Sequence, residues 1–415
     1  MKKILILGGG FAGVETYLHL HKLLHPAGEH DVSIELISKT NYFTFSPMLH
    51  EAATGSVARE HVIQPLREIL HCCGQDFHQA EIQRVDSEQK IVVTDKGEYS
   101  YDILVVALGV EQGYFGVTGA AEHALALKWL PGAIAIRNRI INSFELASEM
   151  HDKKDRHPLD KYLHFIIVGG GATGVELAGQ ISDLVSKEMK KFYGDVPIEL
   201  CKITLMHAGE RVLEQLSPKA SQKAQRRLEE LGVAVQTKQR VTEVQADGVL
   251  LASGEKVESN SIFWTAGTES TLGNIMSGSL LDERKLLRIT PTFQAAGDDS
   301  IFGLGDCARV QDEAFAYPPT AQAAVQAAAL ASKNVIRLLE GTPLKQKKYR
   351  HKGDIIPIGN WYAILERKPL RSSGILAWFL RRVVFLRTMY GWGNRVQIAF
   401  DWCISLFLPR DTSEF

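Results

Sequence analysis

Two short runs of apolar residues, each followed by glycines and then by a helical pattern, are the main repeated feature of the chain. The first run is Ile4–Leu7 and the second is Phe165–Val168. The ten residues that start at Ile6 return at Ile167 with seven identities. A buried strand, a glycine turn and a helix in this order are typical of a parallel-sheet unit. The duplication therefore predicts an α/β chain with two such units.

The glycine turns carry the spacing Gly-x-Gly-x-x-Gly in both copies. The first glycine makes the tight turn, the second lets the backbone approach a pyrophosphate, and the third lets the helix pack closely on the strand. They are Gly8, Gly10 and Gly13 in one copy and Gly169, Gly171 and Gly174 in the other, with Phe11, Ala12, Ala172 and Thr173 between them. A single motif of this kind is often a chance glycine turn, but two in the same context argue for two Rossmann-like dinucleotide-binding domains.

Three further apolar segments end at small residues where each unit would pass beneath its nucleotide. The segment 102–109 ends at Ala107 and Gly109, and the segment 261–267 ends at Ala266 and Gly267. A third buried strand, 300–308, ends in Gly305-Asp306. Asp306 could accept hydrogen bonds from a ribityl chain, ahead of a helix expected over 321–339 that would point its N-terminus at a flavin. Asp306 could equally be a helix N-cap, and the two roles are compatible.

Composition narrows the class of protein and its partners. A chain of 415 residues is long enough for two or three domains, and its formal net charge of −1 argues against nucleic acid as a partner. No apolar run approaches the roughly 18–20 residues of a membrane-spanning helix. No signal peptide is expected. From Glu366 onward eight Lys or Arg residues oppose four acids, which leaves the tail at +4 and the rest at −5.

The five cysteines predict free thiols. They are scattered, with one adjacent pair, Cys72-Cys73, and no CxxC or CxxxxC spacing. An odd, scattered set is typical of a reducing compartment rather than of a disulfide framework. Cys307 is expected to be a small buried residue. A redox-active dithiol is therefore excluded as the route by which electrons leave a flavin, and no metal cluster is expected.

The motifs in this order resemble the two-dinucleotide-binding-domain flavoproteins, and within them the type II NADH dehydrogenases, which are single-subunit NAD(P)H:quinone reductases. The narrower likeness rests on four segments that lie along nearly the whole chain: Asn41–Ala53, Gly171–Gly179, Thr320–Gln326 with its AQxAxQ pattern, and Trp378–Leu408. It implies an FAD domain formed by residues 1–115 and 290–345, an NAD(P)H domain at 116–289 and a membrane-associating region at 346–415. The polar stretch 148–161 is predicted to be a solvated connector.

The resemblance also implies the site residues. Those expected to bind FAD are Gly8, Gly10, Phe11, Ala12, Gly13, Ser38, Lys39, Ile82, Ala107, Gly109, Asp306, Gln322 and Ala323. Those expected to bind NADH or NADPH are Gly169, Gly171, Ala172, Thr173, Gly174, Glu176, His207, Arg211, Ala266 and Gly267. Pro47, Gln322 and Gln326 are expected on the quinone side. Glu176 is the catalytic candidate, in the first turn of its helix, where it would hold the nicotinamide amide or pass protons. Its alternative role is a carboxylate stabilised by the helix N-terminus.

Two departures from the family pattern affect specificity. The acid that family members often carry after the second strand of each unit is replaced by Ser38 and by His207. Ser38 can still hydrogen-bond a ribose. Without an acid near His207, that residue and Arg211 could attract a 2′-phosphate, so the sequence leaves NADH and NADPH open. After Gln326 the usual polar continuation is replaced by Ala327–Ala329, which leaves the details of the quinone site open.

The C-terminal tail predicts contact with a membrane surface, and such contact favours a lipid-soluble quinone as the electron acceptor. Residues 374–387 and 396–408 read as short amphipathic helices, with a break at Gly391-Trp392-Gly393. Four of the six tryptophans lie in the last 55 residues, among arginines, as in a helix at a lipid interface. The alternative is a dimerisation hairpin, and both could hold, because the family often forms homodimers.

The leading hypothesis is a non-pumping, FAD-dependent NAD(P)H:quinone oxidoreductase, monotopic on the cytoplasmic face of the inner membrane. The rivals are a sulfide:quinone reductase, which would need cysteines beside the flavin, and a reductase of a ferredoxin- or rubredoxin-like protein. A nucleotide-sensing flavoprotein with little turnover is the alternative of another class.

Overall fold

The chain folds into two compact units, each assembled from three separate stretches of sequence. The computed structural model describes residues 2–24, 32–70, 76–152, 159–367, 369–405 and 407–414. The first unit comprises Met1–Phe43, Gln64–Glu111 and Glu269–Lys352, and the second comprises Thr44–Ile63, Gln112–Thr268 and Gly353–Phe415. The predicted domain boundaries are 115, 289 and 345, whereas the chain changes unit at 111, 268 and 352. Residues 44–63, predicted within the first domain, belong to the second unit.

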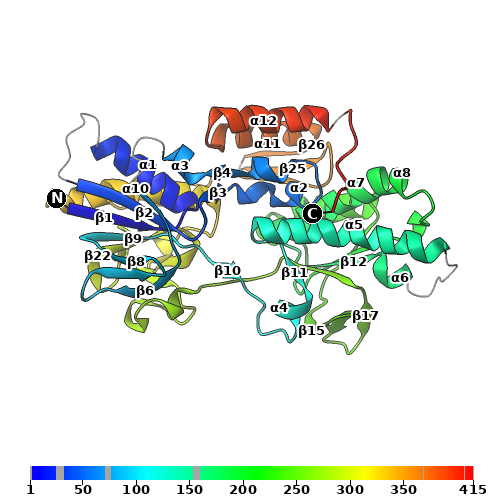
Figure 1. Ribbon diagram of the computed structural model, residues 1–415, viewed down its shortest axis with the longest axis horizontal. Helices are drawn as coiled ribbons and strands as arrows, with labels where there is room; N and C mark the ends of the chain where they lie inside the picture. Colours follow the sequence, from blue (N-terminus) through cyan, green and yellow to red (C-terminus); the bar gives the residue numbers. More distant parts are fainter. Residues whose placement is uncertain are drawn as a thin grey trace. The chain divides into compact units, whose positions relative to one another are not determined.

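The first unit is built on an eight-stranded sheet in the order β23-β20-β21-β22-β9-β1-β2-β5 (Figure 1). Its strands are β1 (Lys2–Leu7), β2 (Val32–Ser38), β5 (Phe77–Gln79), β9 (Ile103–Val106), β20 (Leu287–Ile289), β21 (Gln294–Ala295), β22 (Asp298–Gly303) and β23 (Ala308–Val310). The five strands from β22 to β5 run parallel. The last four residues of β1 are buried, as a continuous apolar run in a covered parallel sheet requires.

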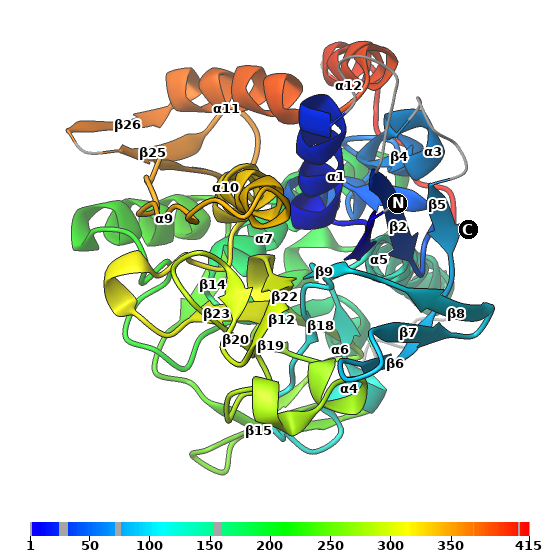
Figure 2. The same cartoon turned by 90° about the vertical axis from the view of Figure 1, so that its left-hand side faces the viewer.

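Two long helices complete this unit. α1 (Phe11–Leu24) and α10 (Ala321–Leu339) lie side by side, as Figure 2 shows. Ser332 on α10 donates a hydrogen bond to the carbonyl oxygen of Thr16 on α1. The smaller elements are α3 (Leu66–Ile69) and an antiparallel sheet of β6 (Ile82–Asp86), β7 (Ile91–Thr94) and β8 (Gly97–Ser100). The expected helix over 321–339 is confirmed.

The second unit repeats the plan with a five-stranded parallel sheet in the order β11-β18-β12-β13-β14. Its strands are β11 (Leu125–Ala126), β12 (His164–Val168), β13 (Lys202–Met206), β14 (Val233–Gln236) and β18 (Ser261–Trp264). The helices α5 (Leu130–Asp152), α7 (Ala172–Leu184) and α9 (Pro218–Glu230) pack against these strands. Shorter helices are α2 (Leu49–Ala52), α4 (Ala120–His123), α6 (Leu159–Tyr162) and α8 (Lys190–Phe192).

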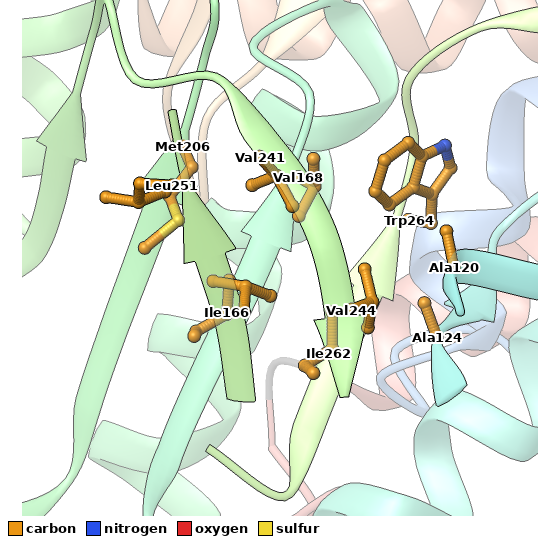
Figure 3. Packing of buried hydrophobic residues seen from close by; sticks show 11 residues of the cluster. Ala120, Ala124, Ile166, Val168, Met206, Val241, Val244, Leu251, Ile262 and Trp264 are labelled. Carbon is orange, nitrogen blue, oxygen red and sulfur yellow. The ribbon is translucent and has the colours of Figure 1, made fainter. Parts of the chain in front are cut away.

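One face of this sheet is covered by α4 and by the antiparallel strands β15 (Val241–Gln245), β16 (Gly248–Leu251) and β17 (Lys256–Glu258). Figure 3 shows the resulting core, in which Trp264 and Ile166 of the parallel sheet meet Val244 of β15 and Ala120 of α4. Burial of these side chains stabilises the unit by about 25 cal/mol per Å² of apolar area removed from water. Two-stranded sheets of β3 (Tyr42–Thr44) with β4 (Ile63–Pro65), and of β10 (Glu111–Gln112) with β19 (Thr268–Glu269), occur where the chain changes unit.

The C-terminal part of the second unit contains more than the two predicted helices. An antiparallel sheet of β24 (Asp354–Pro357), β25 (Ala363–Arg367) and β26 (Leu370–Gly374) precedes α11 (Ile375–Thr388) and α12 (Trp392–Ile404). α12 begins earlier than predicted, so Trp392 and Gly393 are helical rather than part of the break. The left-handed φ of +71° at Gly391 places the turn there. Among the described residues no helix is long and apolar enough to cross a membrane.

The predicted connector at 148–161 is only partly a connector. α5 extends to Asp152 and α6 starts at Leu159, so both ends of the stretch are helical. Residues 153–158 lie outside the described residues, and so do Cys72 and Cys73.

Candidate functional site

The first glycine turn joins β1 to α1 in the first unit. Gly8 has a φ of +111°, and a Cβ there would lie 2.3 Å from the carbonyl oxygen of Ala107 on the neighbouring strand's continuation. A Cβ on Gly13 would lie 1.9 Å from the carbonyl oxygen of Gly8. A Cβ on Gly10, in contrast, would meet nothing within 4 Å. Two glycines are thus required by the protein's own packing, while the space above Gly10 is open.

The second glycine turn, between β12 and α7, repeats this geometry. Gly169 has a φ of +120°, and its Cβ would lie 2.7 Å from Oγ1 of Thr265. A Cβ on Gly174 would lie 1.8 Å from the carbonyl oxygen of Gly169, and one on Gly171 would meet nothing within 4 Å. An open second glycine at a helix N-terminus is what a pyrophosphate needs, because it lets phosphate oxygens reach the backbone N–H groups. The residues present therefore fit one dinucleotide in each unit.

The other predicted FAD residues all lie in the first unit. Ser38 is buried at the end of β2, and Lys39 beside it forms a 2.7 Å ion pair with Glu81. Ile82 starts β6, and Ala107 and Gly109 follow β9, Gly109 with a φ of +68°. Asp306 lies in a short 3₁₀ turn, Gly305–Cys307. Phe11 and Ala12 begin α1, and Ala323, buried in the first turn of α10, donates its N–H to Oγ1 of the capping Thr320. These residues surround the carboxyl ends of the parallel strands.

The two glutamines predicted on the quinone side are hydrogen-bonded to the protein's own chain. Oε1 of Gln322 accepts from the N–H of Lys352 at 3.1 Å. Gln326 donates to the carbonyl oxygen of Arg350 at 3.0 Å and accepts from its N–H at 3.2 Å. Both amides thus fix the segment that leads out of the first unit. Pro47 belongs to the second unit, so the predicted set is divided between the two.

The side chain of Arg211 is held by the turn that follows β13. Its guanidinium donates hydrogen bonds to the carbonyl oxygens of Leu213, Glu214 and Leu216. Nδ1 of His207 accepts the N–H of Gly170 at 3.2 Å, and its Nε2 lies 3.9 Å from the Glu214 carboxylate. Sequence reasoning missed Glu214. It restores an acid beside the end of β13, seven residues later than the usual position.

Glu176 lies one residue beyond the first turn of α7, not within it as predicted, because the helix begins at Ala172. Its Oε2 is 3.4 Å from Nδ1 of His50, and its side chain is 14% exposed. Burial, opposed by Arg381 and reinforced by Glu51, raises the pKa of Glu176 to about 8. Glu176 therefore holds a proton at neutral pH, as a general acid or a hydrogen-bond donor requires.

The tautomer of His50 follows from its second neighbour. Nη2 of Arg381 lies 3.2 Å from Nε2 of His50. A guanidinium only donates hydrogen bonds, so Nε2 accepts and Nδ1 carries the proton. Burial and the charge of Arg381 lower the pKa of His50 to about 3, so the ring stays neutral. His50 thus presents an N–H to Glu176 and has no free lone pair with which to take its proton.

A buried ion pair anchors this histidine to the C-terminal helices. Nη1 of Arg381 on α11 donates to Oε1 of Glu51 at 2.6 Å, and Nε1 of Trp402 on α12 donates to Oε2 of Glu51 at 3.0 Å. Burial opposes ionisation of Glu51, but Arg381 and the other neighbours hold its pKa at about 2. Nη2 of Arg381 also donates to the carbonyl oxygen of Pro47 at 3.2 Å. The predicted quinone-side residue Pro47 is therefore fixed by the same arginine.

Cys307 is unsuited to be a nucleophile. It is fully buried, and burial raises the pKa of its thiol to about 11. The thiol would be protonated at neutral pH. The prediction of a small buried residue is confirmed.

Comparisons with known proteins agree with this architecture. The family described as pyridine nucleotide-disulphide oxidoreductase matches residues 2–328. The type II NADH:quinone oxidoreductase NdhA of Mycobacterium tuberculosis is 31% identical over 98% of this chain and 87% of its own length. The structure of NDH2 from Plasmodium falciparum in complex with NADH has a TM-score of 0.87 at 20% identity, covering 99% of both chains. The sulfide:quinone oxidoreductase of Aquifex aeolicus has a TM-score of 0.73 at 18% identity, covering 99% of this chain and 96% of that one.

Proposed function

Because the chain belongs to the pyridine nucleotide-disulphide oxidoreductases and, within them, to the type II NADH:quinone oxidoreductases, we propose that it transfers electrons from NADH through FAD to a quinone. The observation that carries the proposal is the pair of glycine turns, each with a second glycine facing open space. A protein that bound one dinucleotide would need one such turn. Two turns in two units are suited to a flavin and a nicotinamide held by separate domains.

The first unit would hold FAD and the second the nicotinamide nucleotide. When bound, FAD accepts a hydride from NADH and passes the electrons on. The chain's own residues supply binding and proton chemistry. Gly10 and Gly171 would let the two pyrophosphates reach the backbone N–H groups of α1 and α7. Glu176, protonated and oriented by His50, would donate to the nicotinamide carboxamide or hold a proton needed when quinone becomes quinol.

NADH is proposed as the preferred nucleotide because Glu214 replaces the missing acid, while Arg211 is occupied by carbonyl oxygens. We expect Glu214→Gln to raise kcat/KM for NADPH relative to NADH by about tenfold, since one repulsive charge near a 2′-phosphate is removed. Steady-state assays with both nucleotides measure it. Glu210→Gln is the matched control, because Glu210 is exposed and pairs with Lys238. An unchanged preference in Glu214→Gln would contradict the assignment.

Glu176→Gln is expected to slow quinone-dependent turnover at pH 7 by about 10²-fold, the lower end of general acid–base effects, while FAD stays bound. In the parent protein Glu176 is protonated below its pKa of about 8 and ionised above it. Its pH–rate profile should therefore fall as the pH rises through 8, and the fall should be absent in Glu176→Gln. Glu15→Gln, the equivalent change in the first copy, is the control. Equal kinetics of parent and Glu176→Gln would exclude a role.

The C-terminal helices are proposed to rest on the cytoplasmic face of the inner membrane, from which the quinone ring would enter. Their exposed apolar side chains support this placement: Leu376, Phe379, Leu380, Val383 and Val384 on α11, and Trp392, Val396 and Phe400 on α12. An interfacial helix needs an apolar face with arginines at its edge. A homodimer is also proposed, because an exposed apolar helix face can bury against a second chain.

The proposal is tested by purifying the protein with and without detergent and following its flavin. NADH should reduce the flavin within milliseconds, and a short-chain quinone should reoxidise it at once. Reduction of the flavin by sulfide but not by NADH would favour the sulfide:quinone rival. Reoxidation of the flavin by a ferredoxin but by no quinone would favour the ferredoxin-type rival. Flavin reduction that takes minutes would instead favour a nucleotide sensor.

A further inference from the structure

A pocket of about 380 Å³ lies in the second unit, on the C-terminal helices and the helical segment that follows α7. Its lining combines cationic, aromatic and apolar side chains, of which Trp378 is buried and Phe407 and Leu408 are exposed. The lining residues are Lys187, Glu188, Lys191, Asn360, Trp361, Trp378, Arg382, Ser405, Phe407, Leu408 and Pro409. None of these residues belongs to the glycine turns or to the predicted quinone side.

Arg382 is a partly buried cation, and the carboxylate that acts on it electrostatically, Glu51, is already paired with Arg381. The guanidinium carbon of Arg382 lies 3.6 Å from the ring centroid of Trp378 and 4.6 Å from that of Trp402. Its buried Nε has no hydrogen-bond partner, and among the described residues no ion pair joins its guanidinium directly to a carboxylate. Burial lowers its pKa to about 10. A fixed, partly desolvated cation in this state is stabilised by an anion.

The other charges of the pocket add to this demand. Lys187 and Lys191 are exposed lining residues. Asp183 lies 3.6 Å from Lys187 and partly balances its charge, whereas among the described residues no ion pair includes Lys191. The wall's carboxylate, Glu188, is already paired with Arg410 at 3.4 Å. The excess positive charge disfavours a choline group, and Arg382 occupies the Trp378 face that a quaternary ammonium would need.

Part of the pocket lining is apolar and solvent-exposed. Phe407 is 85% exposed and Leu408 60%, and both line the pocket. A ligand with a phosphate at one end and hydrocarbon at the other matches this arrangement, since the phosphate would reach Arg382 while its chains run along exposed apolar side chains.

We propose that this pocket binds the phosphate of an anionic phospholipid headgroup. The inference rests on the proposed placement of the C-terminal helices on lipid, and it names the lipid class that the surface selects. Phosphatidylglycerol is the probe, because its headgroup carries one net negative charge and no cation. The pocket would then fix the protein on anionic regions of the bilayer rather than on any apolar surface.

The test compares binding of the FAD-loaded protein to vesicles of phosphatidylcholine alone and of equal parts phosphatidylcholine and phosphatidylglycerol. The double variant Lys187→Gln/Lys191→Gln is expected to bind the anionic vesicles about 30-fold more weakly, since each basic residue at such a surface contributes on the order of 1 kcal/mol. The control Lys202→Gln/Lys256→Gln removes the same charge from exposed positions outside the pocket and should bind as the parent does. Equal losses in both pairs would show diffuse attraction and overturn the site.

A second measurement separates lipid from free phosphate. Dihexanoyl-phosphatidylglycerol is expected to change the tryptophan emission through Trp361 and Trp378, and the change should be lost in Arg382→Gln. Inorganic phosphate giving the same change at the same concentration would overturn the lipid assignment, and so would a dimer whose pocket excludes the probe.

Short-chain quinone turnover is expected to be normal in the lysine variants. Lipid binding by a protein that reduces no quinone would leave this inference standing and refute the proposed function.

Discussion

Arg381→Met is expected to lower the free energy of unfolding by about 3–5 kcal/mol, because it leaves the Glu51 carboxylate buried without the cation that is hydrogen-bonded to it. Methionine keeps most of the side-chain volume, so the loss would come from charge rather than from a cavity. Denaturant unfolding of the FAD-loaded protein at pH 7, followed by far-UV circular dichroism, measures it. The carboxylate of Glu51 is ionised at that pH, since its pKa lies near 2.

The matched control for this prediction is Glu51→Gln/Arg381→Met. Removing both charges should recover part of the lost stability, because no isolated ion then remains in the interior. The pH dependence gives a second check. Glu51 has a depressed pKa, so its contribution is present above about 4.5 and is lost as the pH falls toward 2. A single variant as stable as the parent would show that the ion pair contributes little.

Gly10→Ala is expected to yield a folded protein that loses FAD, whereas Gly171→Ala should keep FAD and raise the KM for NADH at least tenfold. Each methyl group enters space that the protein leaves open and the proposed pyrophosphate would occupy. The flavin absorbance of the purified proteins and NADH titrations measure the two effects. The pair therefore tests which unit holds which nucleotide.

Two controls isolate the ligand effect from folding. Gly194→Ala adds the same methyl group in open space outside both motifs and should change neither property. Gly13→Ala should damage the fold itself, because its Cβ would lie 1.9 Å from the carbonyl oxygen of Gly8. Full FAD content in Gly10→Ala, or FAD loss in Gly171→Ala, would contradict the assignment.

Local patterns were sufficient to predict the two parallel-sheet units. The apolar runs before Gly8 and Gly169 are β1 and β12, and the helices after them are α1 and α7. Neighbouring residues decide whether these segments form a strand or a glycine turn, so the sequence alone is sufficient to predict them. The sheet of β24 to β26 was missed, since its strands are short and Asp354–Pro357 has no alternating pattern.

The buried cluster could not be predicted from sequence. Glu51 and Arg381 are 330 residues apart, and nothing in the pattern around either one identifies its partner. His50 and Glu51 lie between apolar residues in Met48–Ala52, and this was the available signal that they are buried. Charged residues within an apolar run are seldom buried unpaired, so the sequence indicates that a partner exists but not which residue it is.

The hydrogen bonds of Arg211 could not be predicted from sequence for a different reason. The sequence leaves NADH and NADPH open, because His207 and Arg211 could attract a 2′-phosphate. In the structure the Arg211 guanidinium donates to three carbonyl oxygens in the turn that follows β13. The carbonyl oxygen of Leu213 also accepts the N–H of Leu216, and the guanidinium supplies further donors to carbonyl oxygens of this turn. Which carbonyl oxygens of a turn need a hydrogen-bond donor depends on the turn's conformation, and residue types do not specify that conformation.

The attachment of α11 and α12 through Arg381 and Trp402 to Glu51 has a consequence for the proposed contact of these helices with a bilayer. An anchor that hangs from a domain can be pulled out or cleaved while the rest stays folded. Here, freeing the two helices would strip a buried carboxylate of both hydrogen-bond donors. Exchange between membranes would therefore proceed by departure of the intact folded chain, and limited proteolysis would not release an active soluble enzyme.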